Sequence, residues 1–264
     1  MSLLLSEADD VDVDDVVARY REHGYAKIGP VIAPEFLARL RARADDLMLG
    51  RRRVDGLFFQ HDAASGRYED LPYGEGYVGP SLGYRKIEKL ERDDLFRALL
   101  ENPLFERIVR RVLSGGVTLY RAVLFSKAPG SSSPLPWHQD AGRFWGLDRD
   151  PEIQIWTAID DASSDAGCLE VIEGSHKRGL VTPLGGVVQP EHVARERADE
   201  RATKVPAKAG EVVVLHNLLW HRSGRNQSPN PRRGFTVCYM NAETRCLRTK
   251  RAPRAFVPVF DGAK

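Results

Sequence analysis

The run VTLYRAVLFSK, residues 117–127, marks the point where the sequence changes character. Its apolar and β-branched residues recur with a period of two, which is typical of a β-strand. Further runs of this kind follow it, separated by turn signals such as GSSSP at 130–134 and SPNP at 228–231. Strands are expected over 153–159, 168–172, 210–216 and 234–241. The second half of the chain is therefore predicted to be an antiparallel β-structure.

The first half of the chain reads differently, because most of its apolar residues recur at helical spacing. Proline and acidic residues near the start of each run are typical of helix N-termini. Helices are expected over 12–23, over about 34–50 and over 94–113. A short strand is expected over 25–32, between the first two helices.

Two segments fit neither pattern. Residues 51–85 combine many glycines with interleaved aromatic residues and show little periodicity. This segment is interpreted either as a surface insertion or as a loop that covers a pocket. The charged segment 191–208 interrupts the strands and predicts a surface helix.

The order of the elements indicates the fold class. Helices come first and strands later, without β–α alternation, which favours an α+β fold with a mainly β core built as a sandwich or barrel. We expect a single domain over 1–264. Its helical and loop-rich part would cover 1–115, and its barrel core would cover 116–264.

Composition excludes several classes of protein. The 264 residues include 39 Lys and Arg against 37 Asp and Glu, and a net charge of +2 gives no electrostatic case for a nucleic-acid partner. No apolar run is long enough to span a membrane, and the N-terminus lacks the features of a signal peptide. Three cysteines without C-x-x-C spacing favour a reducing cytoplasm over a disulfide framework. The sequence does not indicate an oligomeric state.

The stretch PWHQD at 136–140 is the first sign of chemistry. His138 and Asp140 are two residues apart, so they point to the same side of an extended chain. An imidazole nitrogen and a carboxylate oxygen together suit a borderline-hard metal such as Fe(II). The pair alone is weak evidence, since chance readily supplies it in a chain with 7 histidines and 37 acidic residues.

A second histidine motif, WHRSGRN at 220–226, follows the apolar run 212–215. His221 would supply a third ligand from the opposite wall of a barrel. Two histidines and one carboxylate on one face of the metal form the facial triad of non-haem iron oxygenases. His216 competes for this role, but His221 is preferred because Ser223 and two arginines follow it.

Arg232 lies eleven residues after His221, across a Pro-Asn-Pro turn. In an antiparallel hairpin its guanidinium would lie near the metal pocket, where its planar fork suits the far end of a dicarboxylate. Arg233 would point to the opposite face of the strand. The alternative for Arg232 is an ordinary surface position at a turn.

Taken together, these motifs resemble the phytanoyl-CoA dioxygenase-like (PhyH) family of Fe(II)- and 2-oxoglutarate-dependent oxygenases. The likeness covers nearly the whole chain, and the order and spacing of the motifs are more specific than any one of them. Besides those above it includes EHGY at 22–25, WTAIDD at 156–161, GCL at 167–169, GSHK at 174–177 and GEV at 210–212. The fold implied is a double-stranded β-helix, a jelly-roll or cupin-like barrel flanked by N-terminal helices.

The resemblance implies a role for each matching residue. Fe(II) would be held by His138, Asp140 and His221. The co-substrate 2-oxoglutarate would be held by Arg232, Ser223, Trp156 and Lys86, and O2 would be the oxidant. Related halogenases have a small residue in place of the carboxylate, so Asp140 favours hydroxylation or another oxidation over halogenation.

Substrate contacts are less specific. The aromatic loop and the residues near the barrel mouth suit a ring-bearing or sugar-containing small molecule. The candidates are Phe58, His61, Trp145 and His176. A structural hydrogen bond is the alternative for His176.

The sequence therefore predicts a non-haem dioxygenase that hydroxylates a small molecule or oxidises it by ring closure or desaturation. A composition rich in alanine and arginine indicates a high-GC bacterium, in which such enzymes tailor antibiotics and other secondary metabolites. Two alternatives stay open. One is a catalytically silent metal-binding barrel that binds or senses a ligand, and the other is a cupin-type isomerase or hydrolase with another divalent metal.

Overall fold

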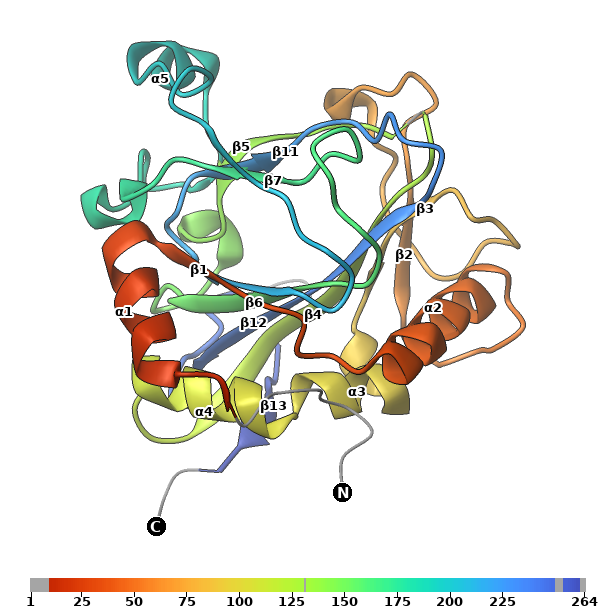
Figure 1. Ribbon diagram of the computed structural model, residues 1–264, viewed down its shortest axis with the longest axis horizontal. Coiled ribbons are helices and arrows are strands. Elements are labelled where there is room, and N and C mark those ends of the chain that lie inside the picture. The colour runs from red at the N-terminus through yellow and green to blue at the C-terminus, as the bar shows by residue number, and fades with distance from the viewer. Residues whose placement is uncertain (1–9, 131, 250–253, 262–264) are drawn as a thin grey trace.

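The computed structural model of the chain describes residues 10–130, 132–249 and 254–261. Two antiparallel sheets face each other, and helices cover the outer side of one of them (Figure 1). This double-stranded β-helix with a mainly β core and N-terminal helices confirms the predicted fold class. Among the described residues, every helix is too short or too polar to cross a membrane. All three cysteines have free thiols.

The larger sheet has eight strands. They are β1 (Tyr25–Ile28), β2 (Phe58–His61), β3 (Tyr84–Glu88), β4 (Val117–Lys127), β6 (Ile153–Ala158), β10 (Val212–His216), β12 (Arg232–Asn241) and β13 (Val257–Phe260). Their order is β1-β10-β6-β12-β4-β3-β2, and β13 pairs with β4 beside this path. The four predicted strands at its centre, β4, β6, β10 and β12, therefore form one continuous wall of the barrel.

The smaller sheet has five short strands. They are β5 (Leu135–Gln139), β7 (Leu169–Val171), β8 (Gly186–Val187), β9 (Thr203–Val205) and β11 (His221–Ser223). Their order is β8-β5-β11-β7-β9. In this sheet β5 and β11 are neighbours, and the two histidine motifs begin on these two strands.

Side-chain alternation along β10 decides what each face of the larger sheet packs against. Val212 and Val214 belong to the cluster shared with the helices, whereas Val213 and Leu215 belong to a cluster inside the barrel that includes Trp156. Both faces of the strand are therefore covered. This is why the sequence of the strand is continuously apolar rather than alternating.

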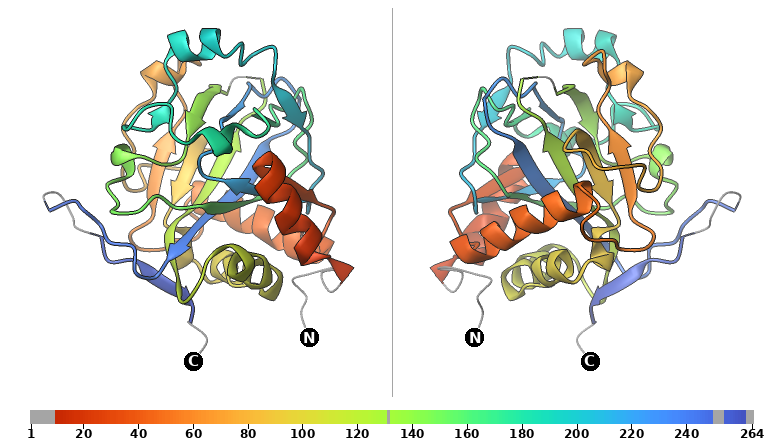
Figure 2. Two further views of the ribbon diagram at one scale, coloured as in Figure 1. Left: turned by 90° about the vertical axis from the view of Figure 1, so that its left-hand side faces the viewer. Right: turned by 90° about the vertical axis from the view of Figure 1, so that its right-hand side faces the viewer.

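Helices pack under the larger sheet (Figure 2). They are α1 (Val13–His23), α2 (Pro34–Met48), α3 (Asp94–Leu100) and α4 (Pro103–Val112). A further helix, α5 (Pro190–Arg195), lies apart from these four. Asp12 caps α1 by accepting the amide hydrogens of Asp14 and Asp15, and Gly24 ends it with φ 85°. The first two helices and the strand between them match the prediction, although that strand ends at Ile28.

The segment 94–113 is helical as predicted, but the structure divides it into two helices, α3 and α4. Pro103 stands at the first turn of α4, where its missing amide hydrogen does no harm, but it cannot continue a preceding helix. The Asn102 side chain accepts the amide hydrogen of Phe105 and starts the new helix. The apolar residues keep a helical spacing across this boundary, so periodicity alone does not reveal it.

Two irregular segments also contain strands that were not predicted. Within 51–85, β2 pairs with β3, and β3 pairs with β4, so this segment extends the larger sheet. Within 191–208 the only helix is the end of α5, and residues 203–205 form β9 beside β7. A strand of three residues is too short to show a period, which also explains why β11 was not predicted as a separate strand.

Candidate metal centre and adjoining cavities

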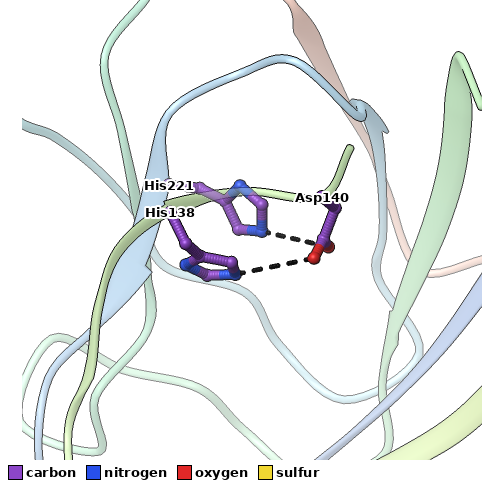
Figure 3. Close-up of side chains that lie close together, drawn as sticks. All are labelled: His138, Asp140 and His221. Carbon is purple, nitrogen blue, oxygen red and sulfur yellow. Dashed lines mark ion pairs between the residues drawn. The ribbon is translucent and has the colours of Figure 1, made fainter. Parts of the chain in front are cut away.

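Three side chains meet at one end of the smaller sheet (Figure 3). They are His138 on β5, Asp140 just after it and His221 at the start of β11, and one possible ligand atom from each lies within 4.8 Å of the others. His221 Nε2 is 3.5 Å from Asp140 Oδ2, and His138 Nε2 is 4.0 Å from Oδ1. Two imidazole nitrogens and a carboxylate oxygen converging in this way fit a divalent transition metal.

The arrangement corrects one expectation. His221 was expected to reach the metal from the opposite wall of the barrel, but it is the register partner of His138 on the adjacent strand. Adjacent paired residues on one sheet face point the same way. The two imidazole rings accordingly lie 4.0 Å apart.

Hydrogen bonds orient the two imidazoles. His138 Nδ1 lies 2.9 Å from the carbonyl oxygen of Pro136, and His221 Nδ1 lies 2.9 Å from that of Leu219. A carbonyl accepts only from a protonated ring nitrogen, so these contacts favour the tautomer with a free Nε2 lone pair. In both residues Nε2 is the ring nitrogen that faces Asp140.

The backbone of Asp140 is held by Asn217, in the turn before β11. The Asp140 amide donates to the Asn217 carbonyl over 2.9 Å, and the Asn217 side-chain amide donates to the Asp140 carbonyl over 2.9 Å. Asn217 is fully buried. These two hydrogen bonds tie the residue after β5 to the turn before β11, which lie far apart in the sequence. They hold the backbone of Asp140 so that its carboxylate faces the two histidines.

The protonation states favour metal binding. Burial and the neighbouring His221 lower the pKa of His138 to about 3, so this imidazole is neutral near pH 7. Burial by itself raises the pKa of Asp140, but the charge of Arg121 and the two imidazoles hold it well below its usual range. Arg121 forms an ion pair with the carboxylate at 3.0 Å. Neutral imidazole and ionised carboxylate are the forms that bind a metal.

A cavity behind these ligands, which we call the inner cavity, is lined by both sheets. The smaller sheet contributes His138, His221 and Ser223, and the larger sheet contributes Arg121, Lys127, Trp156 and Arg232. Of the residues expected at the co-substrate, Arg232, Ser223 and Trp156 are therefore brought together beside the metal ligands.

Arg232 lines the inner cavity from the larger sheet. It was expected on a hairpin with the His221 strand, but its strand β12 belongs to the opposite sheet. One guanidinium nitrogen donates to the Gly167 carbonyl, while the buried Nε has no hydrogen-bond partner among the described residues. Burial lowers its pKa to about 10, which leaves it charged at neutral pH. A buried, incompletely paired guanidinium is a binding point for an anion.

Gly234 makes room for this arrangement. A Cβ atom on Gly234 would lie 2.3 Å from the indole nitrogen of Trp156, so only glycine lets the indole pack flat against β12. The Arg232 guanidinium lies 5.4 Å from the Trp156 ring centroid. The indole thus supports the arginine from the side. Arg233 points the other way, as expected, and pairs with Asp160 and Asp45.

Lys86 is not at the inner cavity, contrary to expectation. It pairs with Glu88 at 2.7 Å on the same strand. The lysine beside Arg232 is Lys127, its register partner, whose Nζ donates to the Ser133 carbonyl over 2.9 Å. Burial and the nearby arginines lower the pKa of Lys127 well below its usual range.

Sequence reasoning missed Lys127, Arg121 and Arg85 as cavity residues. A signal for the first two was present in the run 117–127. Arg121, Phe125 and Lys127 occupy alternate positions of a strand whose other residues are mostly apolar, so they share one face. Charged residues on the buried face of a barrel strand indicate a polar interior.

A second space, the outer cavity, adjoins the metal ligands and has a volume of about 470 Å³. Trp145, expected at the substrate, lines it and stacks on Tyr120 with 4.2 Å between ring centroids. Tyr68, from segment 51–85, also lines it. This contact favours the interpretation of the segment as part of a pocket wall.

The other expected substrate contacts lie elsewhere. Phe58 and His61 line neither cavity, and the His61 ring packs on Tyr84 at 4.0 Å. His176 Nε2 lies 3.0 Å from the Arg21 carbonyl, which matches its structural alternative rather than a substrate contact. His216, the competitor of His221, stacks on Tyr20 at 5.6 Å and is not among the converging ligands.

Comparisons with known proteins give a consistent result. The family profile described as Phytanoyl-CoA dioxygenase (PhyH) matches residues 20–234. "Phytanoyl-CoA dioxygenase domain-containing protein 1" of Danio rerio is 24% identical, over 89% of this chain and 92% of its own.

Two solved structures share the fold. The non-heme alpha ketoglutarate dependent carbocyclase SnoK from nogalamycin biosynthesis aligns with a TM-score of 0.68 and 20% identity, over 97% of this chain and 95% of its own. The epimerase SnoN, in complex with Fe3+, alpha ketoglutarate and nogalamycin RO, aligns with a TM-score of 0.68 and 17% identity, over 95% and 96%. At these identities the likeness concerns the fold.

Proposed function

The chain belongs to the phytanoyl-CoA dioxygenase family, and we propose that it is a non-haem dioxygenase that depends on Fe(II), 2-oxoglutarate and O2. Its reaction is hydroxylation of a C–H bond in a small molecule, or a related oxidation such as ring closure or desaturation. One observation supports this most directly. A neutral His, a charged Asp and a second His converge beside a cavity that is also lined by a buried, incompletely paired arginine.

His138, Asp140 and His221 are the proposed ligands of Fe(II). Three protein ligands on one side leave the remaining positions for a co-substrate and oxygen. When bound, the iron couples the oxidative decarboxylation of 2-oxoglutarate to oxidation of the substrate. The protein contributes the geometry of the ligands and a buried setting that keeps water from the reaction.

Arg232 is the proposed anchor for the distal carboxylate of 2-oxoglutarate. Its guanidinium presents nitrogen atoms in a plane that matches a carboxylate, and Ser223 offers a hydroxyl in the same cavity. The Lys127 amino group lines the same cavity beside Arg232 and adds a hydrogen-bond donor there. A diacid held there by its distal carboxylate points its other carboxylate towards the three metal ligands.

The biological setting we propose is the biosynthesis of a bacterial secondary metabolite such as an antibiotic. A structural relative, SnoK, comes from nogalamycin biosynthesis. The alanine- and arginine-rich composition agrees with a high-GC bacterium. Asp140 favours hydroxylation over halogenation, because its carboxylate occupies the position that related halogenases leave open.

An anaerobic titration tests the proposed site. Adding Fe(II) and 2-oxoglutarate to the metal-free chain should produce a weak visible charge-transfer band. Asp140→Ala and Arg232→Gln should each abolish the band. The matched variants Asp55→Ala and Arg149→Gln change exposed residues and should keep it. A band that survives in both site variants would contradict the assignment.

A further inference from the structure

Arg85 is a buried cation that the proposed chemistry does not use. It lies in β3, is only 8% exposed and lines both the inner and the outer cavity. Within the described part of the chain its guanidinium has no hydrogen bond and no ion pair. Burial lowers its pKa, because losing water disfavours the charged form. Such a group is costly unless a ligand supplies a negative charge.

The carboxylate near Arg85 is already engaged. Asp62 Oδ1 accepts the Ala63 amide hydrogen and Oδ2 accepts the Ser133 amide hydrogen, each over 2.9 Å. The Tyr68 ring lies 5.7 Å from the Arg85 guanidinium and closes one side. Among the described residues, Arg85 therefore lines the two cavities without a protein acceptor for its guanidinium hydrogens.

The other cations of the two cavities have partners. Arg121 pairs with Asp140, and Lys86 pairs with Glu88. Lys127 donates to the Ser133 carbonyl. Apart from Arg232, the proposed anchor of the co-substrate, Arg85 is the cavity cation left for a further anion.

Three exposed apolar side chains line the outer cavity. Phe144, Leu184 and Val187 line it and are 64%, 59% and 39% exposed. Trp145 forms part of the wall behind them. Large apolar side chains exposed around one opening favour a ligand with an apolar body.

We propose that the substrate is an organic acid with an apolar body, whose carboxylate binds Arg85 while its body lies against Phe144, Leu184 and Val187. This inference rests on the proposed function, because it takes the outer cavity as the place of the substrate. A planar guanidinium accepts a carboxylate in a bidentate manner, which orients the molecule as well as holding it. Arg85 lines the same two cavities as His138 and Asp140, so a molecule fixed at Arg85 would share the space beside the metal ligands.

The test compares two probes of one shape, 2-naphthoate and 2-naphthamide, by calorimetry on the metal-free chain. Naphthoate should bind about tenfold more tightly or better, the difference expected for a charge-assisted contact in a buried site. Arg85→Gln should remove this preference, and Arg85→Lys should restore part of it. Arg149→Gln, an exposed arginine, should leave it unchanged. Equal affinity of the two probes, or no binding of either, would overturn the proposal.

A second arm separates Arg85 from the co-substrate site. Affinity for 2-oxoglutarate, read from the anaerobic Fe(II) band, should change less than about threefold in Arg85→Gln and should be lost in Arg232→Gln. Arg232→Gln should leave naphthoate binding intact. If Arg85→Gln instead loses the band as Arg232→Gln does, Arg85 belongs to the co-substrate and the proposal fails. If the unmodified chain gives no band, the proposed function fails, while the naphthoate arm still decides the role of Arg85.

Discussion

The two sheets of the barrel contribute different halves of the candidate site. The smaller sheet and the turn after β5 hold His138, Asp140 and His221, whereas the larger sheet holds Arg232 and Lys127. The larger sheet is backed by a cluster that includes residues of four helices, but the smaller sheet is backed by a short cluster around Trp137 and Trp220. The anion anchors thus stand on the more deeply packed wall, and the metal ligands depend on local hydrogen bonds.

The largest effect should follow loss of a metal ligand. Asp140→Ala removes the charged ligand and leaves Arg121 without its partner. We expect succinate formation from 2-oxoglutarate to fall by roughly a thousandfold, because the metal is no longer held. Asp55→Ala provides the control, and iron content of the purified variants provides the independent measurement. Normal iron content with normal turnover in Asp140→Ala would show that Asp140 is not needed to hold the metal.

Stability should depend more on the larger sheet. Phe235 is fully buried on the helix side of β12 and packs on Phe96 at 5.1 Å. Phe235→Ala should reduce the free energy of unfolding by about 4 kcal/mol. Val171, on β7, is the register partner of His221, and Val171→Ala should cost about 2 kcal/mol.

For metal affinity, the order of these two variants should be reversed. Val171→Ala should weaken metal binding, since it loosens the strand next to His221, while Phe235→Ala should leave metal affinity nearly unchanged. Chemical denaturation and metal titration measure the two quantities separately. Equal effects on metal affinity would show that the two walls are not independent.

One histidine on each sheet should make the metal-free chain sensitive to acid. Burial first, and a neighbouring histidine second, lowers the pKa of His138 to about 3 and that of His216 to about 4. Unfolded histidines titrate near pH 6.5, so the unfolded chain binds more protons below that pH. Stability is therefore expected to fall as pH drops from about 6.5 to about 4.

Thermal melts at a series of pH values measure this slope. His216→Gln should remove the contribution of His216, so the stability should depend less steeply on pH, while metal binding stays unchanged. An unchanged slope in this variant would show that the pKa of His216 in the folded chain is close to its value in the unfolded chain.

The smallest effect should distinguish two lysines. Lys127→Met should weaken 2-oxoglutarate binding about tenfold, since it removes a buried hydrogen-bond donor beside Arg232. Lys86→Met should change it less than about twofold, because Lys86 is paired with Glu88. Titration of the Fe(II) band in both variants decides between them, and a reversed order would restore the expectation from the sequence.

Whether an element could be predicted from the sequence depended mainly on its length. Runs such as 117–127 and 212–215 are long enough to show a period, so the central strands and the first two helices were found. The division between α3 and α4, the three-residue strands β9 and β11 and the pairing of β2 with β3 were not found. They depend on capping and on partners distant in sequence, which local periodicity does not contain.

By itself, the sequence determined which residue types are available for the chemistry. Two histidines, an aspartate and an arginine in a set order were enough to nominate a metal centre and an anion anchor. The tertiary structure decided how they meet: His138 and His221 are partners on one sheet, while Arg232 reaches them from the other. It also decided that Lys127 rather than Lys86 stands beside Arg232, and that Arg85 has no ion-pair partner among the residues that the structure describes. The reason is that side-chain partners across a barrel are set by strand pairing and sheet packing, and both join residues far apart in the chain.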